Sequence, residues 1–281
     1  MTDLSELDAL VQSLAEKFSG QVAVALQSFE TGESYTYRAT KTLRAASLIK
    51  LAILLCALTE VAKGNLRLEQ RFYLTPEDQV GGSGVLWRLQ PGLEPTLHDL
   101  LTLMIIVSDN TATNLLIACL GVNAINTYVQ SVGLSQTRLV GKLQLPHSAD
   151  QESNATCAAD VLGLLVQLER RDLLPDELTE VALELMKKQQ FTEALARYLP
   201  TDAELSDTFV TVASKSGCLR GLWHDAGIIY RDGAPWYALV VLTEDAADRS
   251  YSWEQEGMML IARLSRAIYE RQVYEVQARK P

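Results

Sequence analysis

The sequence contains few of the residues from which metal sites and disulfide frameworks are built. Among its 281 residues are four cysteines and three histidines. None shows C-x-x-C or metal-ligand spacing: Cys56, Cys119, Cys157, Cys218, His98, His147 and His224. Because zinc sites use closely spaced ligand pairs, we expect no metal and no cofactor. Three of the cysteines lie in apolar helical segments, where a buried free thiol is common, so we expect no disulfide.

Basic residues are also scarce. The 25 lysines and arginines are outnumbered by 35 aspartates and glutamates, giving a net charge of -10. Since nucleic-acid binding needs a basic patch, we exclude nucleic acid as a partner. No uninterrupted apolar stretch reaches the ~18 residues of a membrane span. With 48% hydrophobic residues, the chain can bury the core of one large or two intimate domains, and we expect a monomer.

The amino terminus carries no basic segment followed by an apolar core, so no secretory leader is visible. On the sequence as given we expect a cytoplasmic protein. If a leader has been removed, the alternative is a protein that works outside the cytoplasmic membrane.

Hydrophobic periodicity separates the two ends of the chain from its middle. Near the amino terminus it predicts a helix over residues 4–18 and strands over 22–29 and 34–38. The middle, to about residue 205, is almost wholly helical in pattern. The last part predicts strands over 208–214, 225–231 and 236–243 and a helix over 253–272. We therefore expect an α+β fold, in which an antiparallel sheet from both ends of the chain is flanked by the terminal helices. Residues 1–40 and 206–281 would form this sheet domain, and residues 41–205 an inserted all-α domain.

The strongest chemical signal is Ser47-Leu48-Ile49-Lys50 at the head of an apolar run. In a helix, this spacing puts both polar side chains on one face. A lysine held against an apolar core has a lowered pKa, so it can accept the proton of a nearby hydroxyl. Ser47 is thus a candidate nucleophile and Lys50 its base, although S-x-x-K alone also occurs by chance.

Two further short motifs follow in the contexts that such a site needs. Ser108-Asp109-Asn110 lies at a predicted helix-to-helix junction, and Lys215-Ser216-Gly217 ends a predicted strand. The set S-x-x-K, S-D-N and K-T-G characterises class A β-lactamases and penicillin-binding proteins. The chain resembles this superfamily from about residue 8 to residue 270, and residues 101–114 are especially typical of the class A branch.

The resemblance implies a role for each motif residue. Ser47 would form an acyl-enzyme, with Lys50 as its base. Ser108 would pass a proton to the leaving nitrogen, and Lys215 would supply positive potential for that transfer.

The remaining implied roles concern substrate binding. Asn110 would bind the amide side chain of the substrate, and Ser216, before Gly217, its carboxylate. The backbone N–H groups of Ser47 and Cys218 would form the oxyanion hole.

The sequence departs from the family pattern in two places. The loop over residues 139–154 lacks the early glutamate that positions the deacylating water in class A β-lactamases. Its only glutamate is Glu152, which we interpret as a solvated loop charge. In residues 218–227, directly after the third motif, the only arginine is Arg220, which either binds the substrate carboxylate or faces solvent.

Two other features have a more ordinary interpretation. His224-Asp225 invites a catalytic-triad interpretation, but we expect a local structural role because Lys50 already supplies a base. The stretch Gly81-Gly82-Ser83-Gly84 lacks the Gly-Lys-Ser/Thr of a phosphate loop and is expected to form a flexible rim over the cleft.

We therefore expect a serine hydrolase of the penicillin-binding or D-alanyl-peptidase type, acting on a β-lactam or a D-alanyl-type amide and releasing β-lactams slowly. The alternatives are a true class A β-lactamase, a cytoplasmic amidase or esterase, and a non-catalytic β-lactam-binding module.

Overall fold

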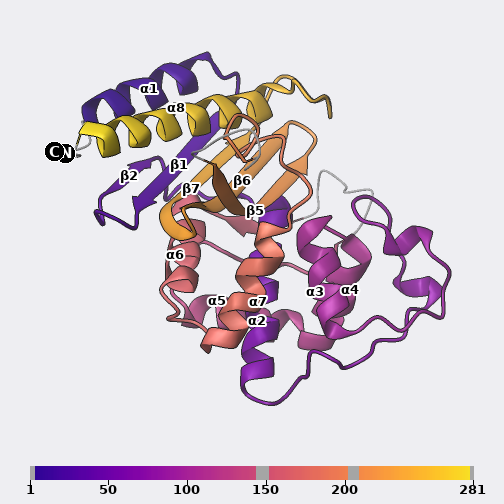
Figure 1. Cartoon of the computed structure of the whole chain (residues 1–281). Helices are drawn as coiled ribbons and strands as arrows, with labels where there is room; N and C mark the ends of the chain where they lie inside the picture. The colour runs from indigo at the N-terminus through magenta and orange to yellow at the C-terminus, as the bar shows by residue number, and fades with distance from the viewer. Residues whose placement is uncertain (1–3, 144–151, 202–208, 279–281) are drawn as a thin grey trace.

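The computed structural model describes residues 4–143, 152–201 and 209–278 (Figure 1). Its helices are α1 (Leu4–Lys17), α2 (Ile49–Ala62), α3 (Leu97–Ile106), α4 (Asn110–Leu120), α5 (Val122–Ser131), α6 (Ala158–Glu169), α7 (Asp176–Lys187) and α8 (Glu256–Ala278). Its strands are β1 (Gln21–Ser28), β2 (Ser34–Tyr37), β3 (Leu43–Arg44), β4 (Ala155–Thr156), β5 (Val210–Leu219), β6 (Leu222–Arg231) and β7 (Ala234–Glu244). Short 3-10 turns are η1 (Ala46–Leu48), η2 (Pro76–Asp78) and η3 (Leu86–Arg88).

The two ends of the chain build one sheet. The strand order is β2-β1-β7-β6-β5 and every neighbouring pair is antiparallel. β1 from the amino-terminal part pairs along its whole length with β7 from the carboxy-terminal part. The predicted α+β fold with a sheet from both termini is therefore confirmed.

The sheet separates two apolar cores, and successive residues of its central strand, β7, contribute side chains first to one core and then to the other. On β7, Ala238, Val240 and Leu242 contribute to one core, and Leu239 and Val241 to the other. This follows from the two-residue period of side chains along a strand. The terminal helices α1 and α8 lie together on one face of the sheet, and the helical part lies on the other (Figure 1).

Helix α2 is the central element of the helical part. All of its residues from Ile49 to Leu58 are buried, because α3, α4, α5 and α7 pack around it. A helix that is apolar all round is stable only inside a protein. Lys50 lies in the first turn of α2, so its side chain starts from a backbone that is already buried in the core.

The structure differs from the sequence-based expectation in the segment before α3. Residues 65–96, predicted as part of an almost wholly helical middle, contain only the 3-10 turns η2 and η3 among regular helical elements. Pro76, Pro91 and Pro95 explain the difference, since proline removes a helix donor and restricts the residue before it.

The carboxy-terminal hairpin also differs from expectation. β5 extends to Leu219 and β6 begins at Leu222. The turn between them contains Gly221, which has a φ of +73°. The third motif therefore lies inside β5 rather than after it. Ser214, Ser216 and Gly217 have low strand propensity, and pairing with β6 overrides it.

The four cysteines are free thiols. No single helix among the described residues is long and apolar enough to cross a bilayer; α4 and α5 reach that length only as a pair, bent by 85°.

Candidate active site

Three separate elements bring the motifs together. Ser47 lies in η1, which precedes α2; the second motif links α3 to α4; and the third lies in β5. β5 contacts η1 directly. At their contact, a Cβ added to Gly217 would lie 2.9 Å from Ser47 N, closer than real Cβ atoms approach. Only glycine at this position lets the strand approach the backbone of the candidate nucleophile.

Lys50 is fully buried, and its ammonium group is bonded to the second motif. Nζ donates to Ser108 O at 2.6 Å, to Ser108 Oγ at 3.0 Å and to Asn110 Oδ1 at 3.0 Å. Ser47 is partly exposed, and its hydroxyl makes no hydrogen bond to Lys50 or to any other described residue. The structure thus joins Lys50 to Ser108 and Asn110 and leaves the Ser47 hydroxyl free for an incoming group.

Both buried lysines are electrostatically perturbed. Burial, reinforced by the positive charge of Lys215, lowers the pKa of Lys50 well below its ordinary value. Burial also lowers the pKa of Lys215 to about 8, although Asp225 opposes the shift. A buried amine loses hydration of its charged form, so Lys50 is suited to accept a proton near neutral pH.

The turn that carries the second motif is strained and firmly held. Ser108 has a φ of 54°, a conformation that costs a non-glycine residue free energy and often marks a functional site. Next to it, the buried Asp109 carboxylate accepts N–H bonds from Val85 at 2.6 Å, Leu86 at 2.9 Å and Ala112 at 2.9 Å. Asp109 thereby fixes the position of Ser108 and of the first turn of α4.

The glycine-rich stretch 81–84, expected to be a flexible rim, is bonded to this same turn. Asn110 N donates to Ser83 O at 3.1 Å, and Asn110 Nδ2 donates to Gly81 O at 3.1 Å. Gly84 has a φ of +96°, and a Cβ there would overlap Asp109 at 2.3 Å. The loop therefore forms part of the support of the second motif.

The third motif presents a mostly unbonded row of polar groups along β5. Lys215 Nζ donates to Ser216 O at 2.8 Å. The Ser216 hydroxyl, the exposed Cys218 thiol and the exposed Arg220 guanidinium make no hydrogen bond or ion pair to a described residue. Arg220 lies in the β5–β6 turn, at the end of the row. Of the sequence-predicted residues, Arg220 is the one that the structure leaves at the periphery.

His224 and Asp225 are both buried and both bonded to the backbone. His224 Nε2 lies 2.8 Å from Arg44 O, and His224 Nδ1 lies 2.9 Å from Trp223 O and 3.1 Å from Thr243 N. Asp225 accepts N–H bonds from Leu195 and from Ala226, each at 3.0 Å. These bonds support the structural role expected for the pair.

Sequence reasoning assigned no role to Asn114, which holds the loop after α5 against the site. Asn114 Nδ2 donates to Leu143 O at 2.8 Å, and Leu143 N donates to Asn114 Oδ1 at 2.7 Å. Asn114 follows Asn110 by four residues on α4, which puts both amides on one helix face. That spacing was the available signal. The backbone of Leu143 is thereby bonded to the residue that lies one helical turn along α4 from Asn110, the amide that binds Lys50.

The rest of this loop bears on the missing glutamate. Glu152 is exposed and forms an ion pair with Arg138, in keeping with a solvated charge. Residues 144–151 lie outside the described part of the chain. In the described ranges no three His, Cys, Asp or Glu side chains are grouped as metal ligands.

An α+β fold in which a serine, a buried lysine and a strand-borne K-S-G come together is that of an active-site serine hydrolase. The chain belongs to the β-lactamase enzyme family, whose model matches residues 6–272. The resemblance inferred from the three motifs is thus confirmed, and the chain is a serine hydrolase of this family.

Individual relatives and solved structures are similar to the chain over most of its length. A β-lactamase of Rhodobacter capsulatus is 28% identical over 252 residues, covering 88% of this chain and 83% of that protein. The crystal structure of a β-lactamase from Sphaerobacter thermophilus DSM 20745 is 29% identical, with a TM-score of 0.87, and covers 97% of this chain and 98% of that one. PBP-A shares the fold at 24% identity and a TM-score of 0.84, with 97% of each chain covered. A leucine-to-glutamate mutant of PBP-A, an acyl-enzyme complex with penicillin G, superposes with a TM-score of 0.83.

Proposed function

We propose that this enzyme is acylated at Ser47 by β-lactams or D-alanyl-type amides and releases the acyl group slowly, as a penicillin-binding protein does. The observation that carries the proposal is the buried Lys50 amine, bonded to Ser108 and Asn110 and lowered in pKa. An amine that is neutral near pH 7 can take the proton of the serine hydroxyl without a histidine.

The acylation step uses the groups already described. Ser47 Oγ attacks the carbonyl carbon while its proton moves to Lys50, and the backbone N–H groups of Ser47 and Cys218 stabilise the oxyanion. Ser108 then gives its proton to the leaving nitrogen and is reprotonated through Lys50. Each oxyanion donor contributes about 2.7–4 kcal/mol to lowering the barrier.

Slow release follows from the residue fixed beside the site. The backbone of Leu143 is bonded to Asn114, one helical turn along α4 from Asn110, and its aliphatic side chain offers no base for a hydrolytic water. A mutant of PBP-A, which shares this fold, has been captured as a penicillin G acyl-enzyme, and this supports the acylation step of the proposal. Glu152 is paired with Arg138 at an exposed position, which does not favour it as a substitute base.

Intact-mass spectrometry during incubation with penicillin G tests the proposal. We expect a single adduct that maps to Ser47, persists for hours and is absent in Ser47→Ala. Rapid turnover of penicillin, with no lasting adduct, would instead support the second candidate, a true β-lactamase.

A variant pair tests the account of slow release. Leu143→Glu should shorten the lifetime of the adduct, because it adds a carboxylate where Asn114 holds the loop. Leu143→Gln, of nearly equal size but without a base, is the matched control. If both variants release the acyl group at the wild-type rate, Leu143 does not occupy the water-activating position.

The true β-lactamase remains the second candidate because the relatives from Rhodobacter capsulatus and Sphaerobacter thermophilus carry that name. Membership of an enzyme family argues against the non-catalytic binding module. A cytoplasmic amidase or esterase would be indicated by turnover of simple amides or esters together with resistance to penicillin acylation.

A further inference from the structure

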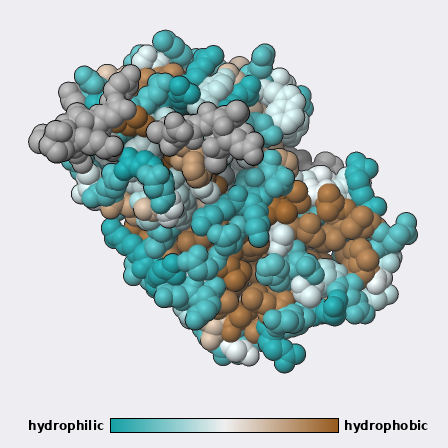
Figure 2. Space-filling model, viewed as in Figure 1, coloured by the Kyte–Doolittle hydropathy of each residue, from teal (hydrophilic) through white to brown (hydrophobic). Residues whose placement is uncertain are grey.

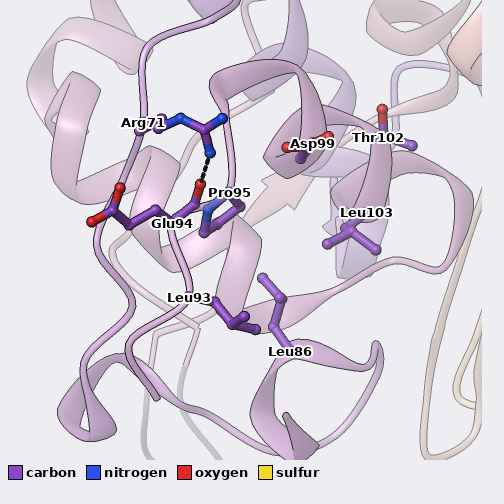
Figure 3. Close-up of a pocket in the computed structure, with 8 residues that line it drawn as sticks. All are labelled: Arg71, Leu86, Leu93, Glu94, Pro95, Asp99, Thr102 and Leu103. Carbon is purple, nitrogen blue, oxygen red and sulfur yellow. Dashed lines mark hydrogen bonds between the residues drawn. The ribbon is translucent and has the colours of Figure 1, made fainter. Parts of the chain in front are cut away.

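A cavity of about 510 Å³ lies in the helical part, apart from the three motifs (Figure 3). Its lining consists of Arg71, Leu86, Leu93, Glu94, Pro95, Asp99, Thr102 and Leu103. The volume is within the range of small-molecule sites. None of the candidate catalytic residues lines it, so it is a second site rather than an extension of the first.

The lining of the cavity is mainly apolar and includes one arginine, Arg71, whose charge reaches the Asp99 carboxylate of the same lining. Leu86, Leu93 and Leu103 point into the same space, and Leu93 is 42% exposed at its edge (Figure 3). The surface over the helical part carries an apolar area in the space-filling view (Figure 2). Leu86 is buried and Leu103 half-buried, so the exposed apolar surface at the rim comes from Leu93, and apolar side chains that line a concave surface are typical of ligand sites.

Arg71 supplies the polar end of this cavity. Its guanidinium donates one N–H to Glu94 O at 2.8 Å and makes no ion pair within the described residues. The two carboxylates of the lining are less available: Asp99 accepts the Thr96 N–H at 2.8 Å as part of the α3 cap, and the Glu94 side chain points away from the leucines (Figure 3). The free N–H groups of Arg71 suit a carboxylate.

The walls of the cavity are bonded to the turn of the second motif. Leu86 N donates to Asp109 Oδ2 at 2.9 Å, and Asp109 N donates to Leu103 O at 3.0 Å. A ligand that packs against these two leucines therefore acts on the residue between Ser108 and Asn110.

We propose that this cavity binds a small amphiphilic carboxylate, with its apolar chain against Leu86, Leu93 and Leu103 and its carboxylate on Arg71. We further infer that its occupancy is coupled to the Ser108–Asn110 turn. The ligand holds Leu86 and Leu103 in place and so restricts the opening of the hydrogen bonds to Asp109.

Calorimetric titration with decanoate, below its micellar concentration, tests the binding. We expect one site per chain, and a dissociation constant about tenfold weaker in Arg71→Ala, from the loss of a charged hydrogen bond. Arg67→Ala, an exposed arginine outside the lining, is the matched control. Leu93→Asp should also weaken binding, and Leu89→Asp, with leucine exposed to a similar degree outside the cavity, should not.

The head group has its own test. Decyltrimethylammonium has the same chain and the opposite charge, and should bind at least tenfold more weakly than decanoate. Equal affinity for the two amphiphiles, or an Arg71→Ala affinity equal to that of Arg67→Ala, would overturn the assignment of the carboxylate to Arg71. Absence of stoichiometric decanoate binding would overturn the site.

Hydrogen exchange measures the coupling without any reaction. Saturating decanoate should slow exchange of the Val85 and Leu86 amides, which donate to Asp109, and leave α8 unchanged. It should also change the rate constant of acylation by penicillin G, because acylation uses the Ser108–Asn110 turn. Unchanged exchange at Val85 and Leu86 would refute the coupling. Slowed exchange in a protein that penicillin does not acylate would leave this inference standing and remove the proposed function.

Discussion

The two walls of the candidate site are built in opposite ways. On the helical wall, Lys50 donates to Ser108 O and Asn110 Oδ1, and the side chains of Asp109 and Asn110 bond to the neighbouring loop. On the strand wall, the side chains of Ser216 and Arg220 make no bond to any described residue. The polar groups of the helical wall have hydrogen-bond partners without a substrate, whereas the side chains of the strand wall still have donors available for one.

This difference separates two tasks. Proton transfer needs groups held in place before the substrate arrives, since preorganised groups need not reorganise during reaction. Binding a substrate carboxylate needs donors that are not already used, because bonded donors must first be released. We therefore expect changes to the helical wall to affect acylation chemistry and stability, and changes to the strand wall to affect substrate affinity.

The largest effect is expected at Lys50. Lys50→Ala removes the proposed base, and the acylation rate constant should fall by about 10²–10⁴-fold, the usual contribution of general-base catalysis. Stopped-flow measurement of acylation by a chromogenic cephalosporin gives the rate. Lys188→Ala, at an exposed lysine, is the control and should retain the wild-type rate. Comparable rates in the two variants would contradict the role of Lys50.

The next largest effect concerns the support of the same wall. Asp109→Ala leaves the N–H groups of Val85, Leu86 and Ala112 without their acceptor. The free energy of unfolding should fall by about 3 kcal/mol or more, because each buried orphan donor costs about 1–3 kcal/mol. Urea denaturation measures it, with the exposed Asp172→Ala as a control that should change stability by less than about 0.5 kcal/mol.

On the strand wall, Arg220→Ala tests whether this exposed arginine binds the substrate carboxylate. If it does, the second-order rate constant for acylation by penicillin G should fall about tenfold. The methyl ester of penicillin G, which lacks the charge, should react equally with both proteins. Arg249→Ala, on the neighbouring loop, is the matched control. An equal loss with acid and ester would mean that Arg220 acts in some other way.

A pH profile compares the two lysines. As the proposed base, Lys50 is needed unprotonated, so acylation should weaken as pH falls through its lowered pKa. In its proposed role Lys215 is needed as a cation, so acylation should weaken as pH rises past its pKa of about 8. Lys215→Arg keeps the charge to higher pH and should move the alkaline limb upward while the acid limb persists. If the alkaline limb does not move, the loss of acylation at high pH comes from the titration of a group other than Lys215.

The smallest effect is expected at Asp225, behind the strand wall. Burial raises the pKa of Asp225 to about 7, above the value of about 3.9 in an unfolded chain. The folded protein then holds this proton more tightly than the unfolded chain does, and stability is lost as pH rises from about 4 to 7. Asp225→Asn has no such proton. Urea denaturation should therefore show the wild type losing stability relative to the variant across this range; parallel curves would contradict the raised pKa.

The sequence predicted the parts of the fold and site that depend on local pattern. The motifs around Ser47, Ser108 and Lys215 stand next to recognisable helices and strands, so their chemistry and approximate location followed from residue type and spacing. The apolar runs of strand length at both ends of the chain were clear enough to predict one sheet. Register and strand order were not predictable, because they depend on pairings such as that of β1 with β7 across the whole chain.

The missing parts depend on contacts between distant segments. The bond from Lys50 to Ser108 O needs the positive φ of Ser108, which no residue preference indicates for serine. The clamp of Asn114 on Leu143 joins a helix to a loop without any local signal for the partner. The third motif lies within β5 because β6 pairs with it, although its own residues disfavour a strand.

The close approach of Gly217 to Ser47 N has a mechanical consequence. The nucleophile belongs to the helical part and the strand beside it to the sheet, so the reactive geometry exists only while the two parts remain in register. Mild denaturant or a rise in temperature that displaces the two parts relative to each other by a fraction of an ångström would abolish acylation. Circular dichroism would still report intact helices. Loss of acylation should thus precede loss of secondary structure as denaturant or temperature increases.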